Sequence, residues 1–369
     1  MNCTRKLFRG ALLTVAAVLS PLSIHAVVAA DNWDEIVAKA KQEGTVVVHG
    51  APGATFRAVQ VAAFNVAYPD IRVQFSGVSG ATEVPKVIRE RRAGIYAWDV
   101  WIGGASGALG ELKEMGFFQP LAPALRPEIM ADDKWIGGFA GGWLDIGQTF
   151  YYAFDGTIQN PVMVNWDFVK KDSIKSLADL ASPAFAGKII WHDPRVSGTG
   201  NGTSQTLFHN LGKDDLVKIY KNKVVYTTNS HQLGEWVVRG RYPIGIGFDQ
   251  QTLAEFQAQG LGKNIGPLPD SFYKAQQISI GFGGVGLVDR APNINAAKVY
   301  INWLLSKEGQ EAWSTVPRSS RRTDVVPVVA ELAPKAGVDY FIGQTEALGP
   351  ERRNLMQVAK EAIDGAAPR

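Results

Sequence analysis

Three short apolar stretches, separated by stretches with helical periodicity, constrain the fold of this chain more than any other feature. Residues 45–49 are a β-branched run, apolar residues alternate with polar ones over 71–75, and 98–102 is again apolar apart from Asp99. Apolar residues recur at helical spacing over 56–67, and a second helix is predicted over 82–92. This order of strands and helices predicts a parallel sheet with crossover helices, and therefore the α/β class.

The turns that follow the first and third of these strands are the first candidate ligand site. In open parallel sheets, ligands bind beyond the carboxyl ends of the strands. Both turns are rich in small residues that let a ligand approach the backbone. The residues predicted to bind a ligand here are Ala51, Pro52, Gly53, Gly104 and Ser106.

A second candidate site lies in the stretch 187–212, where a short apolar strand meets a turn rich in glycine, serine and threonine (SGTGNGTS). The turn opens a helix, so its unpaired N–H groups suit an anion. Arg195 stands beside it and is able to form a fork onto a carboxylate, phosphonate or phosphate, or to pair with Asp193 instead. The turn itself either cradles a ligand or is a capped strand–helix connection. The predicted ligand residues here are Arg195, Ser197, Thr199 and Gly200.

The chain beyond this site continues to alternate strands and helices. Strands are predicted over 224–228 and 244–248, with a helix over 232–239 between them. Asp249 follows the second of these strands and heads the next helix. It either caps that helix or holds an ammonium group of a ligand.

The first thirty residues have the pattern of a secretory signal peptide. Arg5, Lys6 and Arg9 form a basic start, 11–19 is apolar, and small residues precede a predicted cleavage after Ala30. The apolar run is about half of the ~20 residues that a membrane span needs, so an anchor is excluded. Export to the periplasm is therefore expected.

Removal of the signal peptide changes the composition of the mature chain. The single cysteine, Cys3, is lost, which leaves no thiolate and no disulfide. Three of the 38 Lys and Arg residues are also lost, so the remainder balances the 35 Asp and Glu residues. A neutral chain gives no support for a nucleic-acid partner.

Glycine-dense stretches divide the rest of the chain into two lobes. The sequence GGFAGGWLDIG precedes an aromatic strand, and ISIGFGGVGLV sets glycines among β-branched residues. Glycine is unfavourable inside strands, so both stretches predict places where the chain bends between domains. The predicted parts are a signal peptide at 1–30, a discontinuous first lobe at 31–147 and 285–369, a second lobe at 148–284, and crossings near 147–155 and 278–286.

Motifs of enzymes and metal sites are missing from the sequence. It contains no G-x-S-x-G, no P-loop and no H-E-x-x-H, so catalysis is not expected. His49 and His192 each end a strand, but no H-x-x-x-H or H-x-H spacing occurs. We therefore expect no metal site and no cofactor.

Aromatic and basic residues supply the remaining candidates. Trp143, Tyr151 and Phe248 either line the cleft as aromatic walls or are buried in the core. Arg318 belongs to a basic cluster, VPRSSRRTD, after the last core helix. By itself such a cluster indicates a solvated or carboxylate-paired surface patch.

Five sequence stretches, spread over 32–315, carry a resemblance to a known family. They are EGTVVVHG, WDVWIGG, SLADLASPAFAGKIIWHDPR, VRGRYPIGIGFD and APNINAAKVYINWLLSKEGQEAW. In this order and spacing the chain resembles the bacterial periplasmic solute-binding proteins that serve ABC transporters for ferric iron, polyamines, thiamine, sulfate and phosphonates. The resemblance implies the two-lobed type II fold, with each lobe a mixed or parallel sheet flanked by helices.

The resemblance also implies a mechanism. A small-molecule ligand is captured in the cleft by hinge closure and handed to an inner-membrane ABC permease, with Arg318 reaching the cleft from the first lobe. A monomer is expected. A protein of the same fold that reports to a sensor kinase is the alternative to transport.

The nature of the ligand follows in part from a departure from the family pattern. Ferric-binding members carry an adjacent tyrosine pair late in the second lobe, where this chain reads TTNSHQLGEW. Tyr151 and Tyr152 lie instead at the first crossing, and strand alternation points them to opposite faces. A small organic anion, a carboxylate or phosphonate, is the first choice. A cationic solute of the polyamine or thiamine type, held by Asp249 and aromatic walls, and ferric iron are the alternatives.

Overall fold

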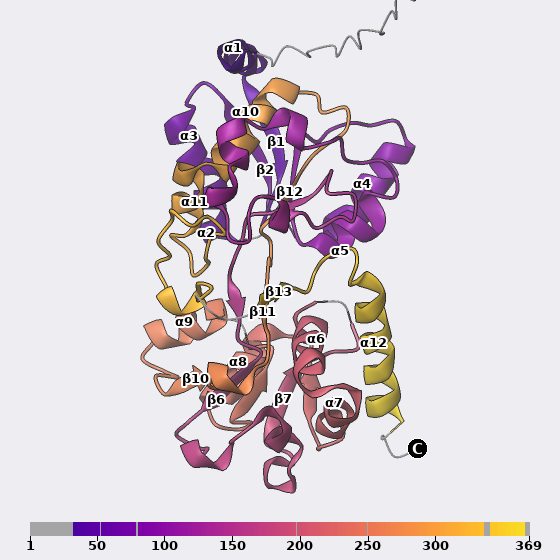
Figure 1. The fold of residues 1–369 in the computed structure, drawn as a ribbon, viewed down its shortest axis with the longest axis vertical. Helices are drawn as coiled ribbons and strands as arrows, with labels where there is room; N and C mark the ends of the chain where they lie inside the picture. The colour runs from indigo at the N-terminus through magenta and orange to yellow at the C-terminus, as the bar shows by residue number, and fades with distance from the viewer. Residues whose placement is uncertain are drawn as a thin grey trace, which may run out of the picture.

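Two lobes, joined by strands between them, make up the protein (Figure 1). The computed structural model describes residues 32–51, 53–78, 80–196, 198–248, 250–335 and 340–365. The predicted signal peptide and its cleavage site after Ala30 lie outside the described residues.

The described secondary structure alternates between helices and short strands. The helices are α1 (Trp33–Glu43), α2 (Ala54–Arg57), α3 (Phe64–Ala67), α4 (Gly80–Arg92), α5 (Ala105–Gly107), α6 (Thr199–Leu211), α7 (Lys213–Tyr220), α8 (Ser230–Val238), α9 (Gln250–Ala258), α10 (Ile294–Leu305), α11 (Lys307–Trp313) and α12 (Gly349–Asp364). The strands are β1 (Thr45–His49), β2 (Arg72–Ser76), β3 (Val100–Gly103), β4 (Tyr152–Ala153), β5 (Ile158–Gln159), β6 (Val162–Asn165), β7 (Ile189–His192), β8 (Val225–Thr227), β9 (Ile244–Ile246), β10 (Ile265–Pro267), β11 (Gln276–Ile278), β12 (Gly284–Leu287) and β13 (Tyr340–Ile342). A π-helical segment, Ala58–Ala63, joins α2 to α3, and a second one, Ala108–Leu112, extends α5.

The first lobe is built on a five-stranded sheet with the order β2-β1-β3-β12-β4. β1 pairs in parallel with β2 and β3, which confirms the parallel sheet predicted for this half. β12 runs antiparallel to β3 and β4, so the return of the chain closes the sheet. Val46 and Val48 of β1 are fully buried, and α10 packs against this strand and against α1.

The second lobe is built on another five-stranded sheet, β10-β6-β9-β7-β8. β7 pairs in parallel with β8 and β9, while β6 is antiparallel to β9 and β10. Ile189 and Trp191 of β7 are fully buried between the helices of this lobe. The carboxyl end of β7 leads to α6, and the carboxyl end of β9 leads to α9, so both helices begin at one edge of the sheet.

A separate three-stranded sheet, with the order β13-β11-β5, lies between the lobes, and we call it the hinge sheet. β5 continues the first passage of the chain into the second lobe, and β11 belongs to the return passage. β13 pairs in parallel with β11 and adds a third strand at this point. The hinge sheet therefore connects elements far apart in the sequence at the level of the cleft.

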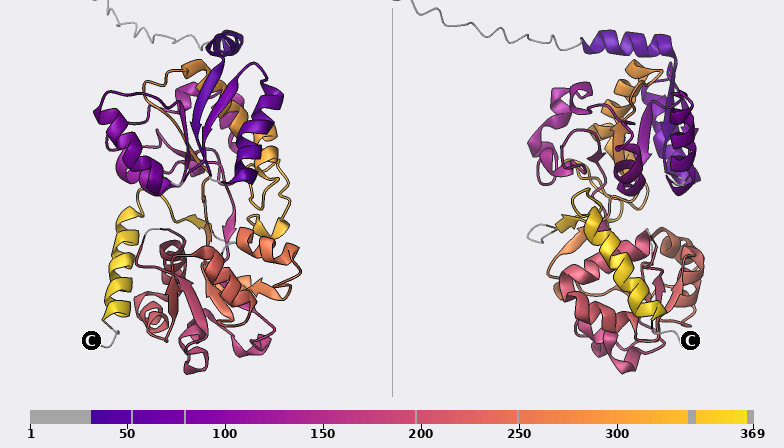
Figure 2. Two further views of the ribbon diagram at one scale, coloured as in Figure 1. Left: turned by 180° about the vertical axis from the view of Figure 1, so that it is seen from behind. Right: turned by 90° about the vertical axis from the view of Figure 1, so that its right-hand side faces the viewer.

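The C-terminal helix α12 departs from the predicted organisation. The sequence prediction assigned the whole of 285–369 to the first lobe, but α12 packs against α6 and α7 of the second (Figure 2). Leu355, Val358, Ala359 and Ala362 form one stripe of this helix and are buried in the core of the second lobe. The stripe indicates an amphipathic helix but not which lobe covers it, because an apolar stripe does not specify the surface that it packs against.

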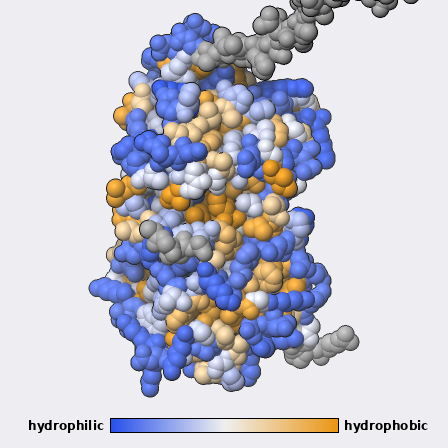
Figure 3. All heavy atoms as spheres, in the orientation of Figure 1, coloured by the Kyte–Doolittle hydropathy of each residue, from blue (hydrophilic) through white to orange (hydrophobic). Residues whose placement is uncertain are grey.

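Hydrophilic side chains cover most of the two lobes in the space-filling view, and apolar residues show in the band between them (Figure 3). Within the described part of the chain, the helices are too short or too polar to cross a membrane.

Candidate ligand-binding site

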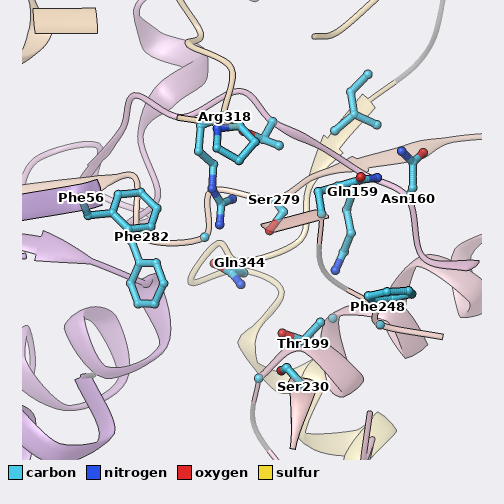
Figure 4. Close-up of a pocket in the computed structure, with 18 residues that line it drawn as sticks. Phe56, Gln159, Asn160, Thr199, Ser230, Phe248, Ser279, Phe282, Arg318 and Gln344 are labelled. Carbon is cyan, nitrogen blue, oxygen red and sulfur yellow. The ribbon is translucent and has the colours of Figure 1, made fainter. Parts of the chain in front are cut away.

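A cavity of about 440 Å³ lies between the lobes (Figure 4). Its wall takes residues from the first lobe, from the second lobe and from the hinge sheet. The residues that line it include Phe56, Gln159, Thr199, Ser230, Phe248, Gln250, Ser279, Gly281, Phe282, Arg318 and Gln344.

Arg318 alone carries a charged side chain among the described residues that line the cavity. Its guanidinium points across the space from the side of the first lobe, toward Gln344 (Figure 4). It lies against Gly281, where a Cβ atom would be 2.6 Å from Nη1 of Arg318. Gly281 has a φ of +50°, so the close approach and the backbone conformation both favour glycine here. The guanidinium of Arg318 can thus lie against the backbone at Gly281, because no side chain stands there.

A buried carboxylate lies behind this cation. Asp155 Oδ2 is 3.9 Å from Arg318 Nη1, and the Asp155 side chain has no solvent exposure. Its Oδ1 accepts from the N–H of Thr157 at 2.7 Å, and its Oδ2 accepts from Trp313 Nε1 at 3.2 Å. Burial raises the pKa of Asp155, against the opposing effect of Arg318.

The opposite wall is formed by the beginnings of three helices of the second lobe. Thr199, Ser230 and Gln250 are the first residues of α6, α8 and α9, and all three line the cavity. The first N–H groups of a helix have no partner within it, and the helix dipole places positive potential at that end. Arg318 faces this wall, so the cavity is positive from both sides.

Aromatic rings and uncharged polar groups complete the wall. Phe56 and Phe282 pack edge to face with centroids 6.0 Å apart, and Phe248 is almost fully buried. Two amide oxygens on the wall, Gln159 Oε1 and Gln344 Oε1, are buried and accept no hydrogen bond. An unpaired buried acceptor is unfavourable, because folded proteins nearly always give such a group a partner.

Of the residues predicted to bind a ligand after β7, only some line this cavity. Thr199 lines it, and Ser197 lies outside the described residues. Gly200 is buried against the end of β7, where a Cβ would meet the carbonyl oxygen of His192 at 1.9 Å. Close packing of α6 against the end of β7 therefore explains why glycine stands at position 200.

The contacts of Arg195 in the structure do not support the prediction that it closes on an anion at this turn. Its Nε and Nη2 donate to both carboxylate oxygens of Asp193, at 3.0 and 2.7 Å, and its Nη1 donates to Asp364 at 2.6 Å. It is not among the lining residues. The alternative of a structural pair with Asp193 agrees with these contacts.

The described ligand residues predicted in the two turns of the first lobe are not among those that line the cavity. Ala51 is fully buried in the core, and Gly53 is exposed at the start of α2. Gly104 caps α5 close to Gly281, and Ser106 Oγ accepts from Arg352 at 2.5 Å. Pro52 lies outside the described residues. The helix α2–α3 starts directly after the first turn, and its Phe56 reaches the cavity in place of the turn.

Tyr151 is a core residue, and Trp143 is partly buried against the core of the first lobe. Tyr151 is fully buried, and its hydroxyl donates to the carbonyl oxygens of Gly103 and Gly284 at 2.9 and 3.2 Å. Burial strongly raises its pKa. Trp143 packs edge to face against Tyr152, on the other face of the first sheet. Of the three predicted aromatic walls, Phe248 lines the cavity, and the adjacent Asp249 lies outside the described residues.

The three arginines of the basic cluster after α11 have different surroundings. Arg318 lines the cavity, and its role in binding stays a prediction. Arg322 pairs with Asp324, but its side chain is buried, so this pair is not the predicted surface patch. Arg321 is not on the surface: it is 2% exposed and donates to the carbonyl oxygens of Ala153 and Ile136. Among the described residues, no group of three or more His, Cys, Asp and Glu side chains is placed to hold a metal ion.

Several lining residues were not predicted, and most come from the hinge. Gln159 is in β5, Ser279 follows β11, and Gln344 follows β13. The predicted crossings, 147–155 and 278–286, leave out Gln159 and Gln344, while Ser279 lies inside the second crossing without having been predicted as a ligand residue. The signal that points to them is polar side chains in short strands next to glycine-rich crossings.

Comparison with known proteins gives consistent matches over most of the chain. Residues 48–311 match the model of a family described as bacterial extracellular solute-binding protein. An uncharacterised protein of Haemophilus influenzae is 25% identical over 283 residues, which cover 74% of this chain and 77% of that protein. A putative 2-aminoethylphosphonate-binding periplasmic protein of Salmonella typhimurium is 29% identical over 164 residues, covering 42% of this chain and 48% of that protein.

Solved structures share the fold at low sequence identity. The periplasmic binding protein AfuA of Actinobacillus pleuropneumoniae, with fructose-6-phosphate bound, has a TM-score of 0.65 and 22% identity, covering 87% of this chain and 99% of that chain. Iron-bound HitA of Pseudomonas aeruginosa has a TM-score of 0.63 and 15% identity, covering 88% and 99%.

Proposed function

The chain belongs to the bacterial extracellular solute-binding protein family, and on that premise we propose that its solute is a small organic anion, a carboxylate or a phosphonate. As a member of this family it is the periplasmic substrate-binding component of an ABC importer, which delivers a small-molecule ligand to a membrane permease. Its structural relatives have the two-lobed type II fold, which confirms the fold class predicted from the sequence.

The observation that carries the choice of an anion is the position of Arg318. It is the charged side chain of the described wall, and it faces the N-termini of α6, α8 and α9. A guanidinium and helix N-termini both favour an anion with several acceptor oxygens. No carboxylate among the described lining residues balances a cationic ligand. The phosphonate named for the Salmonella relative belongs to this class, and the sugar phosphate bound to AfuA is also a small organic anion.

The proposed mechanism is closure of the lobes on the ligand. Arg318 belongs to the first-lobe side of the cavity, and Thr199 and Ser230 belong to the second lobe. A ligand that contacts both sides favours the closed arrangement over the open one, because only the closed arrangement offers both sets of contacts. The hinge sheet supplies the strands about which the lobes move.

Two further parts of the proposal concern the mature protein. We propose that the signal peptide is cleaved after Ala30, on the pattern of a basic start, an apolar run and small residues. We propose also that the mature protein acts as a monomer, because one chain supplies both walls of the cavity.

A thermal-shift screen tests the proposed ligand class. The purified mature protein is heated with small carboxylates, phosphonates, polyamines, thiamine and ferric salts. A ligand that binds the native state raises the melting temperature. We expect a rise with one or more anions and none with polyamines or thiamine. A rise with amines or ferric salts alone would contradict the proposal.

A further inference from the structure

We propose that the ligand carries hydrogen-bond donors in addition to its anionic group, and that Gln159 and Gln344 recognise them. This inference rests on the proposed function, since it concerns the uncharged part of the same anion. The ligand class is then a compact anion with a hydroxyl or an ammonium group.

The first observation is the pair of unsatisfied oxygens. Gln159 Oε1 and Gln344 Oε1 are buried on the cavity wall and have no hydrogen-bond partner. Buried polar groups in folded proteins nearly always have a partner, so an unpaired pair at a ligand cavity is notable. An amide oxygen accepts and cannot donate, and the group that satisfies it must therefore carry an N–H or O–H.

The second observation is that the backbone holds both glutamines at the cavity. Gln159 is in β5, where it pairs with Gln277 of β11. Its amide also lies over the first turn of α6, because a Cβ on Gly202 would be 3.8 Å from it. Gln344 follows β13, which pairs with the same strand β11. Both side chains thus come from the hinge sheet, between the cation of one lobe and the helix ends of the other.

The third observation is the charge of the wall. Arg318 has Asp155 3.9 Å behind it, so part of its positive charge is already compensated. The other described lining side chains are uncharged, and they include Thr157, Asn160 and Ser279. One anionic group satisfies the cation, and the remainder of the wall suits uncharged donors and acceptors. The rings of Phe56 and Phe282 provide an apolar surface for the carbon atoms that connect the anionic group of the ligand to its donor.

The test compares three phosphonates of nearly equal size by isothermal titration calorimetry. Ethylphosphonate has no donor on its carbon chain, 2-hydroxyethylphosphonate has a hydroxyl, and 2-aminoethylphosphonate has an ammonium group. Propionate, 3-hydroxypropionate and 3-aminopropionate form the matching carboxylate series. We expect a donor-bearing member to bind about tenfold or more tightly than its parent anion, because the parent leaves the buried oxygens unpaired.

Two variants connect the preference to the glutamines. Gln159→Met and Gln344→Met keep the length of the side chain and remove the acceptor. Each is expected to lose about tenfold in affinity for the preferred donor-bearing anion and to bind the parent anion unchanged. Gln357→Met, at an exposed position of α12, is the matched control. The melting temperature of the free protein should not fall in the two cavity variants, because neither oxygen has a partner to lose.

The outcomes separate this inference from the proposed function. Equal affinity for parent and donor-bearing anions would overturn the inference and leave the anion site intact. Absence of binding by every anion of both series would overturn the proposed function, and the inference with it. A preference for the hydroxyl or for the ammonium member identifies which donor the glutamines receive. A preference that persists in both methionine variants would contradict the assignment to Gln159 and Gln344.

Discussion

Oδ2 of Asp155, a side chain without solvent exposure, lies 3.9 Å from Nη1 of Arg318, the cation on the cavity wall. The distance is longer than a hydrogen bond, and the carboxylate is held by Thr157 and Trp313 instead. Arg318 is therefore partly balanced in charge and still free to donate to a ligand. The contact connects Asp155, on the first passage of the chain between the lobes, with Arg318 on the cavity wall.

The first prediction concerns Asp155. Asp155→Asn keeps the shape of the side chain and removes the negative charge next to Arg318. We expect anions to bind about tenfold more tightly, because a unit charge several ångströms away contributes on the order of 1–2 kcal/mol at an effective dielectric constant near 20. Calorimetry with 2-aminoethylphosphonate measures the change. Asp364→Asn, an exposed partner of Arg195, should leave the affinity unchanged. Weaker binding in D155N would show that the carboxylate holds Arg318 in place.

The second prediction concerns Gly281, whose φ is +50°. Gly281→Ala puts a Cβ 2.6 Å from Nη1 of Arg318, so the guanidinium must move. We expect anion affinity to fall about tenfold by loss of a charge-assisted contact. Gly94→Ala is the control, since Gly94 also has a positive φ, +74°, and no atom lies within 4 Å of the added Cβ. Both variants lose stability from backbone strain, and only the first should lose affinity. Equal affinities in the two variants would refute the role of Gly281.

The third prediction concerns Arg195 and its two carboxylate partners. Arg195→Ala is expected to destabilise the protein by about 1 kcal/mol, because a half-exposed ion-pair network contributes little more. The Arg195 side chain is 29% exposed, which supports a small effect. Ligand affinity should not change, since the side chain is not on the cavity wall. Urea unfolding and calorimetry measure the two quantities. A loss of affinity above tenfold would restore the anion fork predicted from the sequence.

The fourth prediction is a pH dependence that arises from His49. Burial lowers the pKa of His49 to about 4, and its ring stacks on Trp101 with centroids 3.7 Å apart. The unfolded chain takes up a proton near pH 6.5, while the folded protein stays neutral at His49 until about pH 4. The unfolded state thus binds more protons in this window, and stability falls as the pH is lowered through it.

The expected size of this effect is about 3 kcal/mol between pH 7 and pH 4, from a shift of about 2.5 pKa units at 1.36 kcal/mol each, reduced by partial protonation. Carboxylates also contribute to acid destabilisation, so the comparison is with His49→Gln. Urea unfolding across this range should show a smaller loss in H49Q than in the unchanged protein. Parallel pH profiles in the two proteins would exclude His49 as the source.

Patterns in the sequence predicted the fold better than the site. The β-branched run of β1 and the helical spacing after it require a parallel pair, and β1 pairs in parallel with two neighbours. The amphipathic stripe of α12 predicts a helix but not its partner, because the choice between lobes depends on tertiary packing. Local pattern therefore determines elements, and long-range contacts determine where they pack.

The ligand site was harder to predict than the fold, because the contacts that fix each side chain are not visible in a linear pattern. Arg195 is near the predicted turn, but Asp193 is nearer still and neutralises it. The hydroxyl of Tyr151 is taken by two carbonyl oxygens of the first sheet. Gln159 and Gln344 are 185 positions apart in the printed numbering and meet the cavity only through the hinge sheet. Thr199, which heads a helix after a strand, is the kind of residue that pattern does find.

Calorimetry on Arg318→Gln tests the central claim most directly, namely that this cation holds an anionic ligand between the lobes. The probe is 2-aminoethylphosphonate, or whichever anion gives the largest rise in melting temperature. Loss of a charge-assisted contact should weaken binding more than tenfold in R318Q, with R195Q unchanged. An R318Q protein that binds the anion as tightly as the unchanged protein would contradict the claim.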